Sequence, residues 1–151
     1  MKKIDISSLL FHILLPIVFG SAVGFIFNDS SFVDSLDKTI EVPKILFPIV
    51  WSILYLLIGI WYHNYSYTAN PKQKVLYYVL LFLNFLFTPT LFYFKNITLA
   101  LVIVVILLIG NIVLFKDSIK KGKIGYLLIP YILWLFFAGV LMVDLFVNNI
   151  L

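Results

Sequence analysis

The chain has 151 residues, of which 63% are hydrophobic and 12% are charged, and its mean hydropathy is +1.10. Soluble domains contain roughly 45–50% apolar and about 25% charged residues, so the composition excludes a soluble globular domain. The absence of cysteine excludes disulfides, thiolate metal sites and cysteine nucleophiles. The formal net charge is +4, and every basic residue is a lysine at the end of an apolar run. Membrane topology explains such lysines, so we predict no nucleic-acid partner.

Five apolar segments follow one another along the chain, each long enough to cross a bilayer as a helix. They cover residues 9–27, 45–65, 75–94, 97–115 and 124–147. The alternating strands of about ten residues that build a membrane β-barrel do not occur, and an odd number of spans is unusual for a bacterial barrel. We therefore predict an all-α integral membrane protein, a five-transmembrane-helix bundle in which residues 1–151 form a single membrane domain.

The connections between these segments differ in length. Only the first, 28–44, is long enough to hold structure of its own, whereas the short connection 95–96 makes the third and fourth helices antiparallel neighbours. Pro89 and Pro130 lie inside apolar runs and are predicted to bend the third and fifth helices. The spacing Gly20-xxx-Gly24 permits close helix approach, either within the bundle or across a dimer.

The lysine positions predict the orientation. If the N-terminus is cytoplasmic, the cytoplasmic segments carry eight of the eleven lysines, and the other side keeps Lys38, Lys44 and Lys95. The positive-inside rule therefore favours a cytoplasmic N-terminus and an external C-terminus. The competing interpretation is a secretory signal with a small-residue site at 20–22, but cleavage there would remove a helix that the bundle needs.

Polar groups are costly in hydrocarbon and mark functional sites where they occur. The sequence shows no relay of carboxylates or histidines, which argues against a proton-coupled pump. His12 and His63 lie on different spans without carboxylates nearby, so we predict no metal site. Catalytic triads, phosphate-binding glycine loops and paired carboxylates are also missing, so an enzyme would need unusual chemistry. The main polar residues inside the predicted spans are His12, Ser21, Ser52, Asn84, Thr88, Asn111 and Asp144.

Aromatic and polar residues follow helical spacing on three of the predicted helices, where they share a face. Three such faces could line a flat, mostly apolar pocket for a planar aromatic ligand. Alternatively, these residues only pack the helices or form interfacial belts, which we expect of Trp61, Tyr62, Tyr65 and Tyr67. The faces consist of Phe47, Trp51, Tyr55 and Tyr62 on the second helix, Asn84, Phe87, Thr88 and Leu91 on the third, and Tyr131, Trp134 and Ala138 on the fifth.

Five motifs occur together in order along most of the chain. They are Gly20-xxx-Gly24, Leu36-Asp37-Lys38, Pro43 with Trp51-Ser52-Ile53-Leu54-Tyr55 and Gly59, Leu83-Asn84 with Pro89 and Phe92, and the segment 128–138 with Pro130-Tyr131, Trp134 and Phe137-Ala138. In this order they resemble the TspO/MBR family, the tryptophan-rich sensory proteins of bacteria and the mitochondrial translocator protein, also known as the peripheral-type benzodiazepine receptor.

Some positions depart from the family pattern. The first connection reads Lys38-Thr39-Ile40-Glu41-Val42-Pro43, which is one residue shorter and lacks a family tryptophan. A tryptophan of the third helix is replaced by Phe87, an aspartate of the fourth by Ile103, and an asparagine of the fifth by Met142. We therefore expect a less polar pocket and a first connection that closes differently.

The resemblance implies a five-helix bundle in the bacterial cytoplasmic membrane, commonly a homodimer, with a ligand pocket beneath the first connection. Family ligands are porphyrins such as protoporphyrin IX, haem, isoquinoline carboxamides and, in mitochondrial members, cholesterol; no cofactor is required. Residues 144–151 contain neither tyrosine nor lysine, so we predict no cholesterol recognition through the family's motif there. Trp51 and Trp134 match tryptophans associated with the pocket and with light-dependent porphyrin breakdown, and Tyr55, Asn84, Phe87 and Ala138 match further lining positions.

We therefore expect a membrane sensor of tetrapyrroles or similar planar molecules, with membrane lipid and a second copy of the chain as partners. Ligand binding is expected to close the connection 28–44. Two alternatives stay open: a light-dependent porphyrin-degrading enzyme with Trp51 and Trp134 as its catalytic residues, and a small-molecule transporter, although neither an internal repeat nor an ion-coupling residue is present. The expected ligand-binding residues are Phe47, Trp51, Tyr55, Asn84, Phe87, Thr88, Leu91, Tyr131, Trp134 and Ala138.

Overall fold

The computed structural model describes residues 4–151 and confirms the all-α fold. Within these residues, five helical segments are long and apolar enough to cross a membrane, the last comprising a short 3-10 helix and the helix that follows it. The protein is therefore a multi-pass membrane protein. In chain order the elements are α1 (Ile6–Ile26), α2 (Ser31–Asp34), α3 (Leu46–Tyr65), α4 (Pro71–Phe92), α5 (Ile97–Lys121), the 3-10 helix η1 (Lys123–Leu128) and α6 (Ile129–Asn149).

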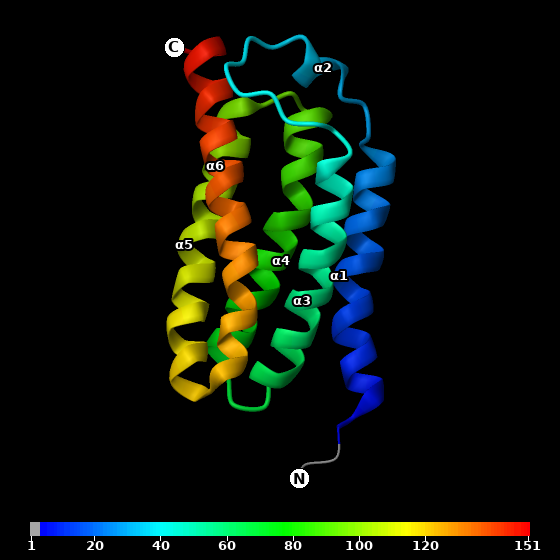
Figure 1. Ribbon diagram of the computed structural model, residues 1–151, viewed down its shortest axis with the longest axis vertical. Helices are drawn as coiled ribbons and strands as arrows, with labels where there is room; N and C mark the ends of the chain where they lie inside the picture. Colours follow the sequence, from blue (N-terminus) through cyan, green and yellow to red (C-terminus); the bar gives the residue numbers. More distant parts are fainter. Residues whose placement is uncertain (1–3) are drawn as a thin grey trace.

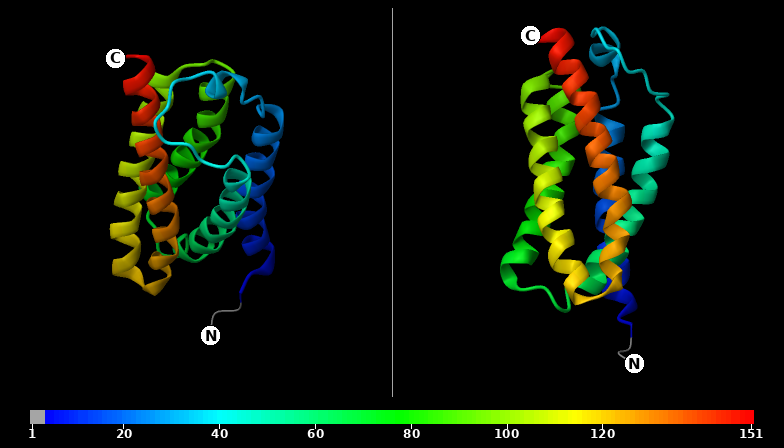
Figure 2. Two further views of the ribbon diagram at one scale, coloured as in Figure 1. Left: turned by 45° about the horizontal axis from the view of Figure 1, so that its top comes forward. Right: turned by 60° about the vertical axis from the view of Figure 1, so that its left-hand side comes forward.

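The five long helices stand side by side in one bundle (Figure 1). Helix α1 packs on α3 and α4, α4 packs on α5, and α5 packs on α6, whereas the main chains of α3 and α6 approach each other at few positions. The connection between α1 and α3, which contains α2, runs across the end of the bundle where α6 finishes (Figure 2). We call this the outer end.

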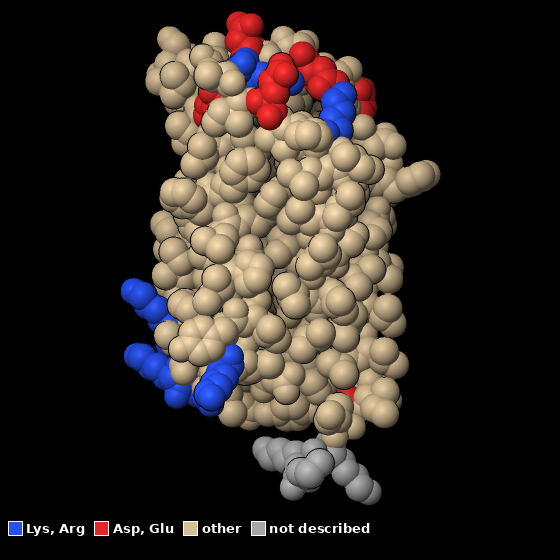
Figure 3. Space-filling model, viewed as in Figure 1, with Lys and Arg blue, Asp and Glu red and all other residues tan. Residues whose placement is uncertain are grey.

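Charged side chains lie at the two ends of the bundle and leave an uncharged band between them (Figure 3). This separation is what a bilayer requires, because charges are costly in hydrocarbon and favourable among headgroups. Side chains in the band are exposed although they are large and apolar, for example Phe25, Phe82, Leu133 and Phe136. Lipid, and not water, is the environment in which such a surface is stable.

Capping and turn residues explain where the helices begin and end. Helix α4 begins at Pro71, before the apolar run, because Asn70 and Gln73 form a capping box and proline favours the first helical turn. Helix α5 continues to Lys121, six residues beyond the predicted 97–115, and stops at Gly122. The polar residues at the start of α4 and at the end of α5 are helical, so a prediction from hydropathy alone made both helices too short.

The prediction that Pro130 bends the last helix is wrong. The segment preceding it, Lys123–Leu128, is a 3-10 helix, and α6 begins at Ile129 with the proline in its first turn. At that position the missing N–H costs no hydrogen bond. Pro130 therefore helps to start α6, whereas Pro89 lies inside α4 as expected.

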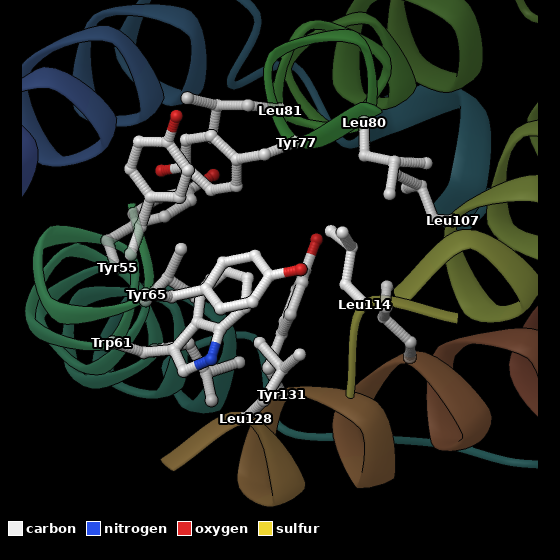
Figure 4. Close-up of a cluster of buried hydrophobic side chains, with 14 of the residues drawn as sticks. Tyr55, Trp61, Tyr65, Tyr77, Leu80, Leu81, Leu107, Leu114, Leu128 and Tyr131 are labelled. Carbon is white, nitrogen blue, oxygen red and sulfur yellow. The ribbon is translucent and has the colours of Figure 1, made fainter. Parts of the chain in front are cut away.

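The aromatic belt predicted at the end of α3 is also wrong for three of its four members. Trp61, Tyr62 and Tyr65 are 0%, 2% and 1% exposed, whereas Tyr67 is exposed. The Trp61 indole N–H donates to Ser118 Oγ at 2.8 Å and the Tyr65 hydroxyl donates to Asp117 at 2.5 Å, so their polar atoms have partners inside the bundle. These rings belong to the central cluster, the apolar core shown in Figure 4.

A second core, which we call the outer cluster, lies closer to the connection that contains α2. It is built from Leu91, Ile97, Ala100, Val104, Met142 and Leu145. Phe32 and Val33 of α2, with Leu36 just after it, pack against this cluster. The first connection is thus held over the outer end by its own apolar residues.

The two glycines predicted to permit close helix approach lie in different surroundings. A Cβ on Gly20 would overlap the ring of Tyr55, whereas a Cβ on Gly24 would meet nothing within 4 Å. Gly20 therefore makes room inside the bundle, and Gly24 faces outward.

Candidate ligand-binding site

Five aromatic rings from α3 and α6 meet between these helices. Trp51 stacks on Tyr55 with 5.3 Å between ring centroids and meets Tyr131 edge to face at 6.2 Å. It also meets Trp134 edge to face at 6.4 Å, and Phe47 contacts Trp134 at 5.8 Å. Helical spacing on both elements explains this, because each helix turns one aromatic face toward the other. We call these five residues the aromatic group.

A chain of hydrogen bonds crosses the bundle beside the aromatic group. The Tyr55 hydroxyl donates to Asn84 Oδ1 at 3.0 Å, and Asn84 Nδ2 lies 2.6 Å from the Tyr131 hydroxyl, to which it donates. All three side chains are buried. Asn111 of α5 is also buried, and its Nδ2 donates to the Leu107 carbonyl at 2.8 Å. The site thus combines flat apolar surfaces with a small number of fixed polar groups, which is typical of a small-molecule site.

The other predicted residues lie closer to the outer end. Phe87 packs against both clusters, while Leu91 and Ala138 belong to the outer cluster or pack on it. Thr88 is half-buried on α4. The structure therefore brings six predicted residues into direct contact, the aromatic group with Asn84, and leaves the remaining four outside this contact.

A groove of about 360 Å³ opens on the bundle surface between α3 and α6. It lies beside the aromatic group, because Trp134 forms part of its wall. Its other lining residues lie outside the faces predicted from the sequence, although three of them, at positions 130, 133 and 137, share the helical spacing of Trp134 along α6. A mixed aliphatic stripe of this kind resembles ordinary lipid-facing surface, so its spacing alone did not single it out. The lining residues are Val50, Ile53, Leu54, Pro130, Leu133, Trp134 and Phe137.

Comparison with known proteins decides the family. The model of the TspO/MBR family matches residues 12–147. The chain belongs to the TspO/MBR family. It is 31% identical over 148 residues to the Tryptophan-rich protein TspO of Bacillus cereus, covering 91% of this chain and 92% of the relative. It is 30% identical over 132 residues to Protein CrtK of Rhodobacter capsulatus, covering 81% of each chain. It is also 30% identical over 110 residues to the Tryptophan-rich protein TspO of Archaeoglobus fulgidus, covering 71% of this chain and 72% of the relative.

Membership of the TspO/MBR family makes this chain a membrane protein of a sensory family, and the structure shows what occupies its departures from the family pattern. Ile103 and Met142 are buried at 5% and 2% exposure, in the central and outer clusters respectively. Phe87 lies between the two clusters. Apolar packing therefore fills these positions of the TspO/MBR fold.

The two histidines, which lie on different helices, meet through one serine. Ser8 Oγ is 3.4 Å from His12 Nδ1 and 3.3 Å from His63 Nδ1, and the two imidazole centroids are 5.8 Å apart. Among residues 4–151 there is no group of three or more His, Cys, Asp or Glu side chains that could hold a metal ion. The contact joins α1 to α3 at the end opposite the first connection.

Proposed function

We propose that this TspO/MBR protein binds a planar, largely apolar molecule among its aromatic group and acts as a membrane sensor of that molecule. The observation that carries the proposal is the contact of the Trp51 ring with Tyr55, Tyr131 and Trp134, beside the buried Tyr55–Asn84–Tyr131 hydrogen bonds. Stacked and edge-to-face rings favour flat aromatic ligands, and a few fixed polar groups orient them. Phe87, Thr88, Leu91 and Ala138 would line the part of the site nearer the outer end.

Tetrapyrroles are the ligand class to test first. Porphyrin or haem offers a large flat surface for the indole and phenol rings and polar substituents at its edge. Two relatives are named as tryptophan-rich proteins, and two of the three tryptophans of this chain belong to the aromatic group. The proposal requires no cofactor and no metal.

Tryptophan fluorescence tests the proposal, because the chain has only three tryptophans. Trp61 is fully buried and bonded to Ser118, apart from the aromatic group. In Trp61→Phe, the remaining indoles report on the site, whereas in Trp51→Phe/Trp134→Phe the only indole is the remote one. We expect saturable quenching by protoporphyrin IX, in detergent and in the dark, for Trp61→Phe, and weak or absent saturable quenching for the double variant.

The controls separate binding from folding. Circular dichroism must show the same helical content in both variants, and a soluble analogue of tryptophan must not show saturable quenching. If Trp61→Phe shows no saturable quenching with protoporphyrin IX or haem, tetrapyrrole binding at this site is wrong. If both variants bind protoporphyrin IX with the same Kd, the rings of Trp51 and Trp134 are not needed for binding.

The edge-to-face contact between Trp51 and Trp134 favours a second candidate, light-dependent porphyrin degradation. Two indoles beside a bound macrocycle are well placed to exchange electrons with its excited state. Illumination of the same complex in air distinguishes the two functions. Loss of porphyrin absorbance that Trp51→Phe or Trp134→Phe abolishes while binding persists would favour the enzyme, and stable absorbance would favour the sensor.

We further propose that the protein lies in the bacterial cytoplasmic membrane as a homodimer, with the outer end facing away from the cytoplasm. The described lysines support this orientation, because Lys38, Lys44 and Lys95 lie at the outer end and the others at the opposite end. The outward-facing surface of α1 around Gly24 and Phe25 is exposed and is available for a second copy.

A further inference from the structure

Side chains in the last turns of α6 hold the first connection by hydrogen bonds to its main chain. Asp144 Oδ2 accepts from the backbone N–H of Thr39 at 2.9 Å and of Ile40 at 3.1 Å. Asn149 Oδ1 accepts from the backbone N–H of Asp37 at 3.0 Å, and its Nδ2 donates to the Asp37 carbonyl at 2.7 Å. Four hydrogen bonds to main-chain atoms therefore fasten residues 37–40 to a helix more than a hundred positions away in the sequence.

The carboxylate of Asp144 is itself held in place. Asn148 Nδ2 donates to Asp144 Oδ1 at 3.0 Å, which leaves the other carboxylate oxygen for the connection, and it also lies 3.3 Å from Thr39 Oγ1. Bonds to an ionised acceptor are roughly twice as strong as bonds between neutral groups. Asp144 is therefore the main fastening point, and Asn148 and Asn149 assist it.

Beyond Ile40 the chain crosses from α6 to the start of α3 (Figure 2). We call residues 37–45 the strap. At the α3 side, Lys44 Nζ pairs with Asp34 Oδ2 at 2.5 Å and donates to Ser30 Oγ at 2.9 Å. The hydrogen bond from Lys44 holds the pKa of Asp34 below its usual range. The strap is thus fastened at both ends, to α6 by Asp144 and to the α2 region by Lys44.

The strap joins the two helices that carry the aromatic group. The main chains of these helices approach each other at few positions, and an apolar groove opens between them beside Trp134. The rings of the aromatic group are therefore the main direct contact between α3 and α6, and the strap supplies a second connection at the outer end. Releasing it would allow the outer ends of α3 and α6 to separate around Trp51 and Trp134.

We infer that Asp144 is a positioning residue that keeps the strap closed and thereby limits access to the aromatic group. The inference rests on the proposed function only for the identity of the molecule that enters. When the Asp144 hydrogen bonds break, the part of the strap beyond Asp37, which Asn149 still holds, lifts from α6, the rings become accessible, and a flat ligand exchanges faster. Re-formation of the bonds encloses the ligand.

The first test needs no ligand. Because the chain lacks cysteine, Ile49→Cys on α3 and Val143→Cys on α6, which replace exposed residues, take spin labels specifically in the full-length chain in nanodiscs. Asp144→Ala should broaden the label–label distance distribution toward longer distances. The amides of Thr39 and Ile40 should exchange hydrogen roughly tenfold faster, as expected after loss of bonds to a charged acceptor. Asp29→Ala is the matched control, because that carboxylate accepts from Ser31 within the connection.

The second test measures access to the rings. In the Trp61→Phe background, acrylamide should quench the remaining indoles more strongly after Asp144→Ala than after Asp29→Ala. Protoporphyrin IX should associate and dissociate faster by roughly tenfold, with a smaller change in Kd, because the barrier falls for both directions.

The outcomes separate this inference from the proposed function. If amide hydrogen exchange and label–label distances are unchanged in Asp144→Ala, Asp144 does not fasten the strap. If the amides of Thr39 and Ile40 exchange faster but acrylamide quenching is unchanged, the strap does not limit access to the rings. If the unsubstituted chain fails to bind protoporphyrin IX, the proposed ligand class is wrong, whereas the exchange, distance and acrylamide data still decide the role of Asp144.

Discussion

Asn84 is the polar residue on which the candidate site depends at the level of single residues. Its side chain is 5% exposed and bridges the hydroxyls of Tyr55 and Tyr131 on two other helices. Hydrogen bonds between membrane helices contribute modestly, on average about 0.6 kcal/mol, because the unfolded chain finds other partners in the bilayer. Leaving two buried hydroxyls without their partner adds a further cost.

We therefore expect Asn84→Leu to lower the free energy of unfolding by about 1–2 kcal/mol. Unfolding of the protein in mixed micelles with increasing denaturing detergent, followed by circular dichroism, measures this change. In the Tyr55→Phe/Tyr131→Phe background the same substitution should cost less, because it orphans no tyrosine hydroxyl. Equal losses in both backgrounds would show that Asn84 stabilises the bundle through packing and not through these hydrogen bonds.

Prediction of single residues from sequence succeeded where helical spacing was the cause and failed where partners came from distant segments. The spacing of Phe47, Trp51, Tyr55 and Tyr62 predicted one face of α3. Phe47 and Trp51 do meet rings of α6, whereas Tyr62 stacks on Tyr77 of α4. Trp61 and Tyr65 were expected at the interface, yet they are buried because Ser118 and Asp117 of α5 satisfy their polar atoms. A tryptophan near the end of an apolar run looks the same from sequence whether its N–H is bonded to water or to another helix.

Helix α1 is the least buried element of the bundle, and it depends on close contact with α3. In the described part of the chain, Pro16 is the one fully buried residue of α1. A Cβ on Gly59 of α3 would lie 2.6 Å from the His12 carbonyl oxygen and from Ile13 Cα. These are backbone atoms, which cannot move aside as a flexible side chain can. Gly59 therefore sets how closely the two helices approach.

We expect Gly59→Ala to push α1 away from α3 and to destabilise the protein by about 1–3 kcal/mol, the usual cost of overpacking. Gly24→Ala is the matched control, because a Cβ there meets nothing within 4 Å and alanine favours a helix over glycine. Thermal unfolding in detergent and hydrogen exchange of the α1 amides measure both effects. Comparable unfolding temperatures for the two variants would contradict the role of Gly59.

At the element level, apolar run length predicted the five spans, and local signals could have improved their ends. Asn70-Pro71 with Gln73 is a capping pattern visible in the sequence, and it moves the start of α4 to Pro71. The attachment of the first connection to α6 was less accessible to prediction. Its hydrogen bonds to Asp144 and Asn149 join segments far apart in the chain, and no spacing rule relates them.

The distribution of charge is a property of the whole molecule, and it predicts which end faces the cytoplasm. The outer end carries Asp29, Asp34 and Asp37 near three lysines, whereas the opposite end is rich in lysine and has few acidic residues (Figure 3). Lysine in short connections is retained on the cytoplasmic side during insertion, and acidic residues have little influence. The connection between α3 and α4 should therefore be cytoplasmic, and the connection that contains α2 should be external.

Single cysteines placed in this cysteine-free chain measure the orientation directly. Ser35→Cys and Thr68→Cys replace exposed residues of the α1–α3 and α3–α4 connections. In intact bacterial cells a membrane-impermeant maleimide should label Ser35→Cys, and it should label Thr68→Cys only after the cells are permeabilised. The reverse pattern would place the outer end, with its strap and Asp144, in the cytoplasm, and the molecules reaching the aromatic group past the strap would then come from inside the cell.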